Sequence, residues 1–205
     1  MIVFFDIDGT IFNFSEAEFI KLWGDLAHKY FNRYLKRELT FDEQRRSRIK
    51  ALYISTYLSF YRDSWKAFDD VISCLNELKD IQLGVISNGD YEHQIDKLTK
   101  VGLVDYFSAV ITSGEVGYSK PDKRLFIEAC KKLGETPTQC NYVGDDLSLD
   151  ILGCNAAGLK GIWLNRKQEV TDQKNIVTIN DLHALPNLLI LKERKVNGEQ
   201  TGHFR

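Results

Sequence analysis

An apolar run at residues 2–5 leads directly into two carboxylates, Asp6 and Asp8, which are followed by Gly9 and Thr10. The run reads Ile-Val-Phe-Phe, and such a short β-branched and aromatic stretch is typical of a fully buried strand. Carboxylates at the end of a buried strand are costly unless a cation or hydrogen bonds compensate them. The pair therefore suggests a Mg²⁺ site, since Mg²⁺ prefers oxygen ligands. Taken alone, the same residues are equally compatible with a surface turn at Gly9.

The composition is that of an ordinary globular protein. The chain has 205 residues, of which 43% are hydrophobic and 27% charged, enough for one large domain or a domain with an insertion. The formal net charge of −2 gives no basic excess, so a nucleic acid polymer is not an expected partner. No apolar run is long enough to span a bilayer, and we expect no membrane association.

The cysteines point to a reducing compartment. The four cysteines, at positions 74, 130, 140 and 154, have neither disulfide nor zinc-site spacing. They are expected to be buried, reduced thiols, as in a cytoplasmic protein. No pattern of a basic region, an apolar segment and a cleavage site marks a signal peptide at the N-terminus.

Residues 14–65 are predicted to form a helical insertion after the first strand. Capping-box signatures begin at Ser15 and at Thr40, and apolar residues then recur at intervals of three and four. The insertion carries a basic cluster, which consists of Arg45, Arg46, Arg48 and Lys50. The ordinary interpretation of this cluster is a solvated helix face, and the alternative is a positive field that attracts an anionic substrate.

Strands and helices alternate through the remainder of the chain. Apolar runs predict strands at residues 83–86, 109–111, 141–143, 161–164 and 176–179. Helices are predicted at about 67–79, 91–101 and 181–191, from Lys120-Pro121 to Gly134, and from Asp146 to Ala157 before Gly158. This alternation predicts an α/β fold with a parallel sheet covered by helices on both faces. The core comprises residues 1–13 and 66–193, and residues 194–205 are expected to be a flexible C-terminal tail.

Polar groups follow three of the predicted strands. Asp6 and Asp8 follow the first, Ser87-Asn88-Gly89 follow the strand at 83–86, and Asp145 with Asp146 follow the strand at 141–143. Ligands of parallel α/β sheets bind at the carboxyl ends of the strands. Each segment alone is most often a turn or a helix start, but together they predict one site.

These groups suit phosphoryl chemistry. A carboxylate beside Mg²⁺ can attack phosphorus, and a second carboxylate can give a proton to the leaving alcohol. Phosphoryl oxygens also need hydrogen-bond donors and a cation. Ser87 and the backbone near Asn88 and Gly89 can be the donors, and Lys120 can be the cation. Asp145, Asp146 and Asp150 then supply the acid that completes the metal shell.

The motifs resemble those of the haloacid dehalogenase superfamily, in its phosphatase form. They cover residues 5–10, 86–89, 120–121 and 143–150, within a resemblance that extends from Ile2 to about Leu191. The resemblance implies a Rossmann-like core, and an insertion after the first motif resembles the first subclass of helical caps. In one departure, Ala67-Phe68 stand where this subclass usually has Pro-Gly at the hinge between cap and core.

The resemblance also implies roles for individual residues. Asp6 is the nucleophile that becomes an aspartyl-phosphate, Asp8 the general acid and base, and Lys120 the cation that steadies both nucleophile and phosphate. Thr10, Ser87, Asn88 and Gly89 are assigned to phosphate binding. The Mg²⁺ ligands are Asp6, Asp145 and the backbone carbonyl of Asp8. The resemblance implies that Asp150 and Asp146 lie behind these ligands, where Asp150 orients Lys120 or a metal-bound water molecule. The role of Asp146 is left open.

The implied function is Mg²⁺-dependent hydrolysis of a small phosphorylated metabolite, such as a nucleoside monophosphate or a sugar phosphate. A phosphomutase, a haloacid dehalogenase and a catalytically silent binding protein are the alternatives. Dehalogenases of the superfamily lack the second acid, so Asp8 favours phosphate chemistry. A signalling receiver is disfavoured, because its phosphorylated Asp follows a middle strand and Ser87-Asn88 stand there instead. The sequence leaves open whether the chain is a monomer or a homodimer.

Overall fold

The computed structural model describes residues 1–13, 16–51 and 62–190. The chain divides into two compact units: Met1–Phe12 with Ala67–Arg205 form one, and Asn13–Lys66 form the other. A two-stranded sheet of β2 (Phe12–Asn13) and β3 (Lys66–Ala67) stands at the boundaries between them. The predicted N-cap Ser15 and the predicted tail at 194–205 lie outside the described residues.

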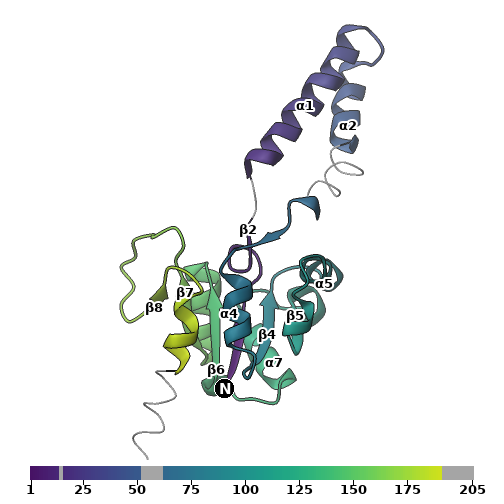
Figure 1. Ribbon diagram of the computed structural model, residues 1–205. Coiled ribbons are helices and arrows are strands. Elements are labelled where there is room, and N and C mark those ends of the chain that lie inside the picture. Colours follow the sequence, from purple (N-terminus) through teal and green to yellow (C-terminus); the bar gives the residue numbers. More distant parts are fainter. Residues whose placement is uncertain (14–15, 52–61, 191–205) are drawn as a thin grey trace, which may run out of the picture. The chain divides into compact units, whose positions relative to one another are not determined.

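The first unit is built on a parallel six-stranded sheet, shown in Figure 1. Its spatial order is β5-β4-β1-β6-β7-β8, so β1 pairs with β4 on one side and β6 on the other. The strands are β1 (Ile2–Phe5), β4 (Gln82–Ser87), β5 (Ala109–Thr112), β6 (Cys140–Gly144), β7 (Lys160–Leu164) and β8 (Val177–Ile179). The prediction of a parallel α/β sheet is confirmed, because every pairing in this sheet is parallel.

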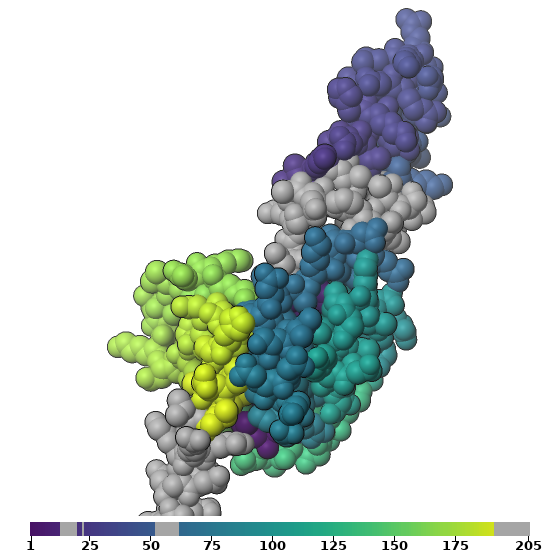
Figure 2. Space-filling view, viewed as in Figure 1, coloured from purple at the N-terminus to yellow at the C-terminus, as the bar shows by residue number. Residues whose placement is uncertain are grey.

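Helices cover both faces of this sheet. On one face Phe4 and Tyr142 belong to a buried cluster with Phe126, whose ring packs edge-on against Tyr142 at a centroid distance of 5.2 Å. That cluster joins the sheet to α7 (Lys123–Lys132) and α8 (Gly153–Ala157). On the other face α4 (Val71–Glu77) and the helical residues 184–190 lie in front of the sheet (Figure 1). Figure 2 shows α4 at the surface, between the yellow C-terminal segment and the teal segment.

The remaining elements of this unit connect the strands. They are α5 (Tyr91–Lys100), the short helix α6 (Ser113–Val116), the 3₁₀ turns η2 (Val104–Tyr106) and η3 (Pro137–Gln139), and the π-helical turn η4 (Leu147–Leu152). Gly158 ends α8 in the left-handed conformation, with φ of 95°, as the sequence predicts.

Two predicted helix starts are wrong. The helix predicted from residue 67 begins at Val71, because residues 66–67 belong to the small sheet instead. The helix predicted to open at Lys120-Pro121 begins at Lys123, and its N-cap is Asp122, whose side chain accepts a hydrogen bond from the Arg124 amide. Proline is favoured in the first turn of a helix, but an aspartate at the N-cap marks a helix start equally well. Here the helix begins directly after Asp122.

The second unit contains α1 (Glu16–Leu35) and α2 (Phe41–Ala51), which pack together. The capping box at Thr40 is confirmed: the Glu43 amide donates to Thr40 Oγ1 at 3.2 Å, and the Thr40 amide donates to Glu43 Oε2 at 2.8 Å. Within the basic cluster, the Arg48 guanidinium lies 4.7 Å from the centre of the Trp23 ring. Arg48 therefore packs between the two helices, whereas Arg45, Arg46 and Lys50 are exposed.

A partly buried ion pair between Arg166 and Asp70 connects three distant parts of the first unit. Arg166 donates to both carboxylate oxygens of Asp70, at 2.8 and 2.9 Å, and to the carbonyl of Thr10 at 3.2 Å. Asp70 also accepts from the Leu182 amide at 2.9 Å. The Arg166 guanidinium stacks over Phe68, 3.9 Å from the ring centre. The start of α4, the first motif and the turn before the C-terminal helix are thus linked through Arg166 and Asp70.

Replacing Asp70 with Asn is expected to lower the free energy of unfolding by about 3 kcal/mol at pH 7, because Arg166 loses its buried partner. Burial on its own raises the pKa of Asp70, but Arg166 and the Leu182 amide outweigh it and hold that pKa below its usual value. The stabilisation is therefore present above the unfolded pKa of about 3.9 and is lost as pH falls through the lower folded pKa. Urea unfolding at several pH values measures both effects, with the exposed neighbour Asp69→Asn as control. A difference that persists unchanged well below pH 4 would contradict this account.

The cysteines are buried, as the sequence predicts. All four cysteines lie in the described residues and are buried free thiols. Among the described helices, none combines the length and hydropathy that a membrane crossing requires.

Candidate active site

Three neighbouring strands bring the predicted site together. Asp6 follows β1, Ser87 ends β4, and Asp145 follows β6. Because β4, β1 and β6 are adjacent and parallel, their carboxyl ends meet at one edge of the sheet. The Asp6 amide extends the pairing with β6 by donating to the Val143 carbonyl at 2.9 Å, which fixes where its side chain begins.

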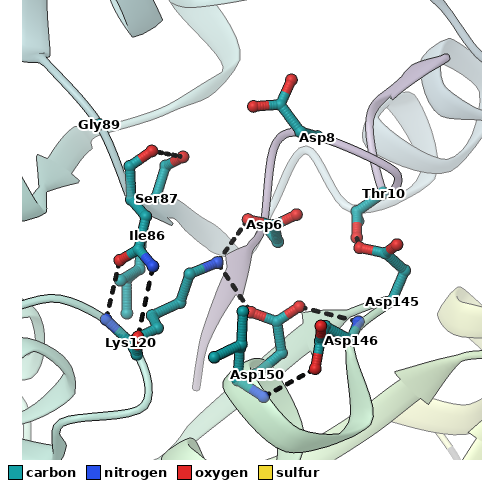
Figure 3. A network of polar contacts seen from close by, with 12 residues as sticks. Asp6, Asp8, Thr10, Ile86, Ser87, Gly89, Lys120, Asp145, Asp146 and Asp150 are labelled. Atoms are coloured by element: carbon teal, nitrogen blue, oxygen red, sulfur yellow. Dashed lines mark hydrogen bonds and ion pairs between the residues drawn. The ribbon is translucent and has the colours of Figure 1, made fainter. Parts of the chain in front are cut away.

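A buried lysine joins two of the acids. The Lys120 ammonium donates to Asp6 Oδ1 at 2.5 Å and to Asp150 Oδ1 at 2.7 Å, as Figure 3 shows. All three residues are buried, with exposed fractions of 5% for Asp6, 7% for Lys120 and 1% for Asp150. Two carboxylates in such a setting are stable only with a cation between them, and Lys120 supplies one.

Burial changes the proton affinity of these groups. It raises the pKa of Asp6 to about 7; Lys120 opposes this rise, while Asp150 and Asp145 add to it. Burial also lowers the pKa of Lys120, but the charges of Asp6 and Asp150 more than reverse that effect and raise it. Lys120 therefore remains a cation, and the positive charges near Asp6 favour the ionised form of its carboxyl group at neutral pH.

A tyrosine hydroxyl completes this buried network. Tyr142 Oη lies 3.2 Å from the Lys120 ammonium, 3.0 Å from Asp150 Oδ1 and 3.2 Å from the Ile86 carbonyl. Burial and the nearby charges of Asp150 and Asp6 raise the pKa of Tyr142 well above its usual value. The hydroxyl is therefore a neutral partner that satisfies Lys120 and Asp150 without adding charge.

Two acids of the fourth motif, which covers residues 143–150, accept hydrogen bonds from backbone amides of the same motif. Asp150 Oδ2 accepts from the Asp146 amide at 3.1 Å. The Asp146 carboxylate in turn accepts from the amides of Ser148 and Leu149, both at 2.8 Å, and so caps η4. Asp146 thus has a structural contact that accounts for its presence, and Asp150 is held facing Lys120.

Three carboxylates form a group that can hold a metal ion. One oxygen each from Asp6, Asp145 and Asp150 lie within 4.8 Å of one another. Burial, followed by the charge of Asp150, raises the pKa of Asp145. A Cβ at Gly9, where φ is 84°, would lie 2.2 Å from Asp145 Oδ2, so only glycine leaves room for this carboxylate. The oxygen-only donor set fits Mg²⁺.

The second motif lies beside Lys120. Asn88 Oδ1 accepts from the Lys120 amide at 2.8 Å, and Asn88 Nδ2 donates to the Lys120 carbonyl at 3.3 Å. This pair of bonds fixes the backbone from which the Lys120 side chain extends. Ser87 is buried and its hydroxyl donates to the Asn88 carbonyl at 3.3 Å. The Gly89 amide already donates to Ser113 Oγ at 2.9 Å.

The two acids of the first motif have different surroundings. Asp6 is buried, whereas the Asp8 side chain is 60% exposed and points away from the Lys120 ammonium in Figure 3. The ammonium of Lys97, on α5, donates to both Asp8 oxygens, at 2.7 and 2.8 Å. Thr10 is fully buried, and its hydroxyl lies 3.4 Å from Asp145 Oδ1.

Three residues near the site were not predicted from the sequence: Lys97, Tyr142 and Arg166. Lys97 did leave a signal, because Gln94, Lys97 and Leu98 share the buried face of α5 and two of them are polar. Tyr142 left a weaker one, since a tyrosine inside a buried strand must find a partner for its hydroxyl. Arg166 sits in a loop after β7, where no pattern marks it.

Known proteins are similar to this chain in sequence. The family profile of the haloacid dehalogenase-like hydrolases matches residues 1–158. The glyceraldehyde 3-phosphate phosphatase of Methanothermobacter thermautotrophicus is 32% identical over 91% of this chain and 98% of its own length. The phosphoserine phosphatase of Thermus thermophilus is 40% identical over 42% of this chain, and the matched region spans only 34% of that protein.

A solved structure agrees with this assignment. The haloacid dehalogenase-type phosphatase from Thermococcus onnurineus superposes with a TM-score of 0.69 and 28% identity, over 92% of this chain and 97% of that one. A 2-haloacid dehalogenase from Pseudomonas syringae has the same fold, with a TM-score of 0.64 at 24% identity. The chain therefore belongs to the haloacid dehalogenase superfamily of hydrolases, and it is one of the phosphatases of that superfamily.

Proposed function

We propose that the chain is a Mg²⁺-dependent phosphohydrolase that cleaves a small phosphorylated metabolite through an aspartyl-phosphate on Asp6. The observation that carries this proposal is the buried contact of Lys120 with Asp6 and Asp150, beside a group of three acids that fits a metal ion. A carboxylate with a raised pKa beside a fixed cation is suited to be a nucleophile once a metal ion adds further positive charge.

Asp6, Asp145 and the backbone carbonyl of Asp8 would hold the Mg²⁺. When bound, the ion neutralises charge on the phosphoryl oxygens and on Asp6. Asp150 contacts Lys120 and lies within the same acid group, so it orients Lys120 and contributes charge near the ion. Lys120 would contact both Asp6 and a phosphoryl oxygen, and Ser87 and the Asn88 amide would donate to the other oxygens. Thr10 and Gly89, which the resemblance also assigns to phosphate, already donate to Asp145 and Ser113.

The reaction would proceed in two steps. In the first, Asp6 attacks phosphorus, the bond from phosphorus to the ester oxygen breaks, and Asp8 gives its proton to the departing alkoxide. In the second, Asp8 takes a proton from a water molecule, the water oxygen attacks phosphorus, and the bond from Asp6 to phosphorus breaks. Asp8 is suited to this role because it is exposed, unlike Asp6.

The names of the relatives support a proposal for the substrate class. Their names refer to glyceraldehyde 3-phosphate and phosphoserine, and a further relative, from Mus musculus, is named an N-acylneuraminate-9-phosphatase. All of these are small phosphorylated metabolites, so the same class is proposed here.

We also propose that residues 14–65 act as a cap that closes over the substrate. The protein is further proposed to work in the cytoplasm.

Phosphate release from p-nitrophenyl phosphate tests the proposal directly. Activity is expected with Mg²⁺ and is expected to fall to background when EDTA is added, because the acid group then lacks its cation. Restoring excess Mg²⁺ should restore the rate, which separates metal removal from denaturation. Full activity in EDTA would contradict the metal dependence, and no turnover across sugar, nucleotide and carboxylic acid phosphates with Mg²⁺ would contradict the hydrolase mechanism.

A further inference from the structure

The ammonium group of the buried residue Lys97 contacts the exposed carboxylate of Asp8. Its side chain is 2% exposed, while the Asp8 side chain that it contacts is 60% exposed. Its ammonium lies 2.7 and 2.8 Å from the two Asp8 oxygens, across 89 residues of sequence. Burying a lysine is costly, and an ordinary surface ion pair contributes little stability, so stability alone explains this arrangement poorly.

The helix that carries Lys97 is fixed beside the site. Asp90 caps α5 by accepting from the His93 amide at 3.1 Å. One turn before Lys97, Gln94 Nε2 donates to the Asn88 carbonyl at 3.1 Å, which connects α5 to the second motif. Lys97 thus stands on a helix that is capped and connected to the second motif, and its ammonium reaches Asp8 of the first motif. Such an element can hold another side chain in one orientation.

We propose that Lys97 is a positioning residue for Asp8. Through its two hydrogen bonds it holds the Asp8 carboxyl group in the orientation that proton transfer to the leaving-group oxygen requires. The inference rests on the proposed function, in which Asp8 is the general acid. An exposed aspartate without such a contact samples several rotamers, and proton transfer depends on correct placement of the donor.

This role predicts a dependence on the leaving group. Nitrophenolate departs readily without a proton, whereas phenolate is far more basic and benefits from general acid catalysis. The ratio kcat/KM reports only the steps up to release of the phenol, so it isolates the first proton transfer from hydrolysis of the aspartyl-phosphate. Loss of Lys97 should therefore affect phenyl phosphate more than p-nitrophenyl phosphate.

The test compares the two esters in wild type and Lys97→Met. We expect kcat/KM for phenyl phosphate to fall about tenfold more than kcat/KM for p-nitrophenyl phosphate. General acid catalysis as a whole contributes about 10²- to 10⁴-fold to a rate, and loss of positioning should remove only part of that contribution. Lys100→Met is the matched control, because Lys100 is an exposed lysine one turn further along α5. That variant should leave both ratios unchanged. Equal losses with the two esters in Lys97→Met would overturn the inference.

Two further measurements keep the outcome decisive. If Lys97→Met fails to fold, Lys97→Gln keeps a polar group in the buried position and should show the same selective loss. In an Asp8→Asn background the substitution of Lys97 should have no further selective effect, because Lys97 acts through Asp8. A selective effect that persists without Asp8 would overturn the inference. A wild type that hydrolyses neither ester with Mg²⁺ would instead contradict the proposed function.

Discussion

Replacing Asp6 with Asn is expected to lower the rate of phosphate release by about 10⁴-fold or more, the scale seen when an enzyme loses its nucleophile. The amide is nearly the same size but cannot form the acyl phosphate, and it replaces one carboxylate oxygen of the acid group that is proposed to hold Mg²⁺. Steady-state release of inorganic phosphate measures the loss. Mass spectrometry of the wild type after rapid acid quenching should show a phosphoryl group on the peptide that contains Asp6, and none in the variant.

The variant should remain folded, which makes the loss interpretable. Asp6 has a raised pKa because it is buried, so a neutral amide is tolerated at this position electrostatically. Asp80→Asn is a suitable control, since Asp80 is exposed at the end of the loop that precedes β4. A folded Asp6→Asn protein with more than a few per cent of wild-type activity would show that another group attacks phosphorus.

Much of the site could be predicted from the sequence because of how parallel sheets are built. An apolar run followed by acids locates the end of a strand, and adjacent parallel strands bring their ends to one edge. Asp6, Ser87 and Asp145 were found in this way, without knowledge of which strands are neighbours. The order β4-β1-β6 then gives the geometry that the sequence pattern implies.

Other parts could not be predicted, because they depend on contacts between side chains far apart in the sequence. The contact from Lys97 to Asp8 and that from Arg166 to Asp70 require the angle of a helix and the path of a loop. Hydrophobic periodicity specifies neither of these. The start of α7 shows a local limit as well, because proline at 121 and aspartate at 122 are competing signals for the same helix start.

The described acids and lysines of the site divide into two sets. Lys120 is buried between Asp6 and Asp150, where the phosphoryl group would be attacked. Lys97 contacts Asp8 at the exposed side, where the alcohol would leave. Each carboxylate that is proposed to do chemistry thus has its own cation, on a different element of the core.

Replacing Lys120 with Met is expected to impair both activity and stability. The rate of phosphate release should fall by about 10³-fold, because the transition state loses a fixed cation. The free energy of unfolding should fall by about 3–5 kcal/mol, because Asp6 and Asp150 are left buried without a counter-charge. Phosphate release and urea unfolding measure the two effects separately. Lys123→Met, at an exposed lysine in the first turn of α7, should change neither.

A second substitution separates the two roles of Lys120. Adding Asp150→Asn to Lys120→Met removes one of the unpaired charges, while Tyr142 Oη remains within 3.0 Å of that side chain as a neutral partner. The double variant should therefore recover a large part of the lost stability, as happens when both members of a buried pair are neutralised. Its activity should stay low, because the transition state still lacks the cation beside Asp6. Recovery of activity together with stability would show that Lys120 acts on the fold alone.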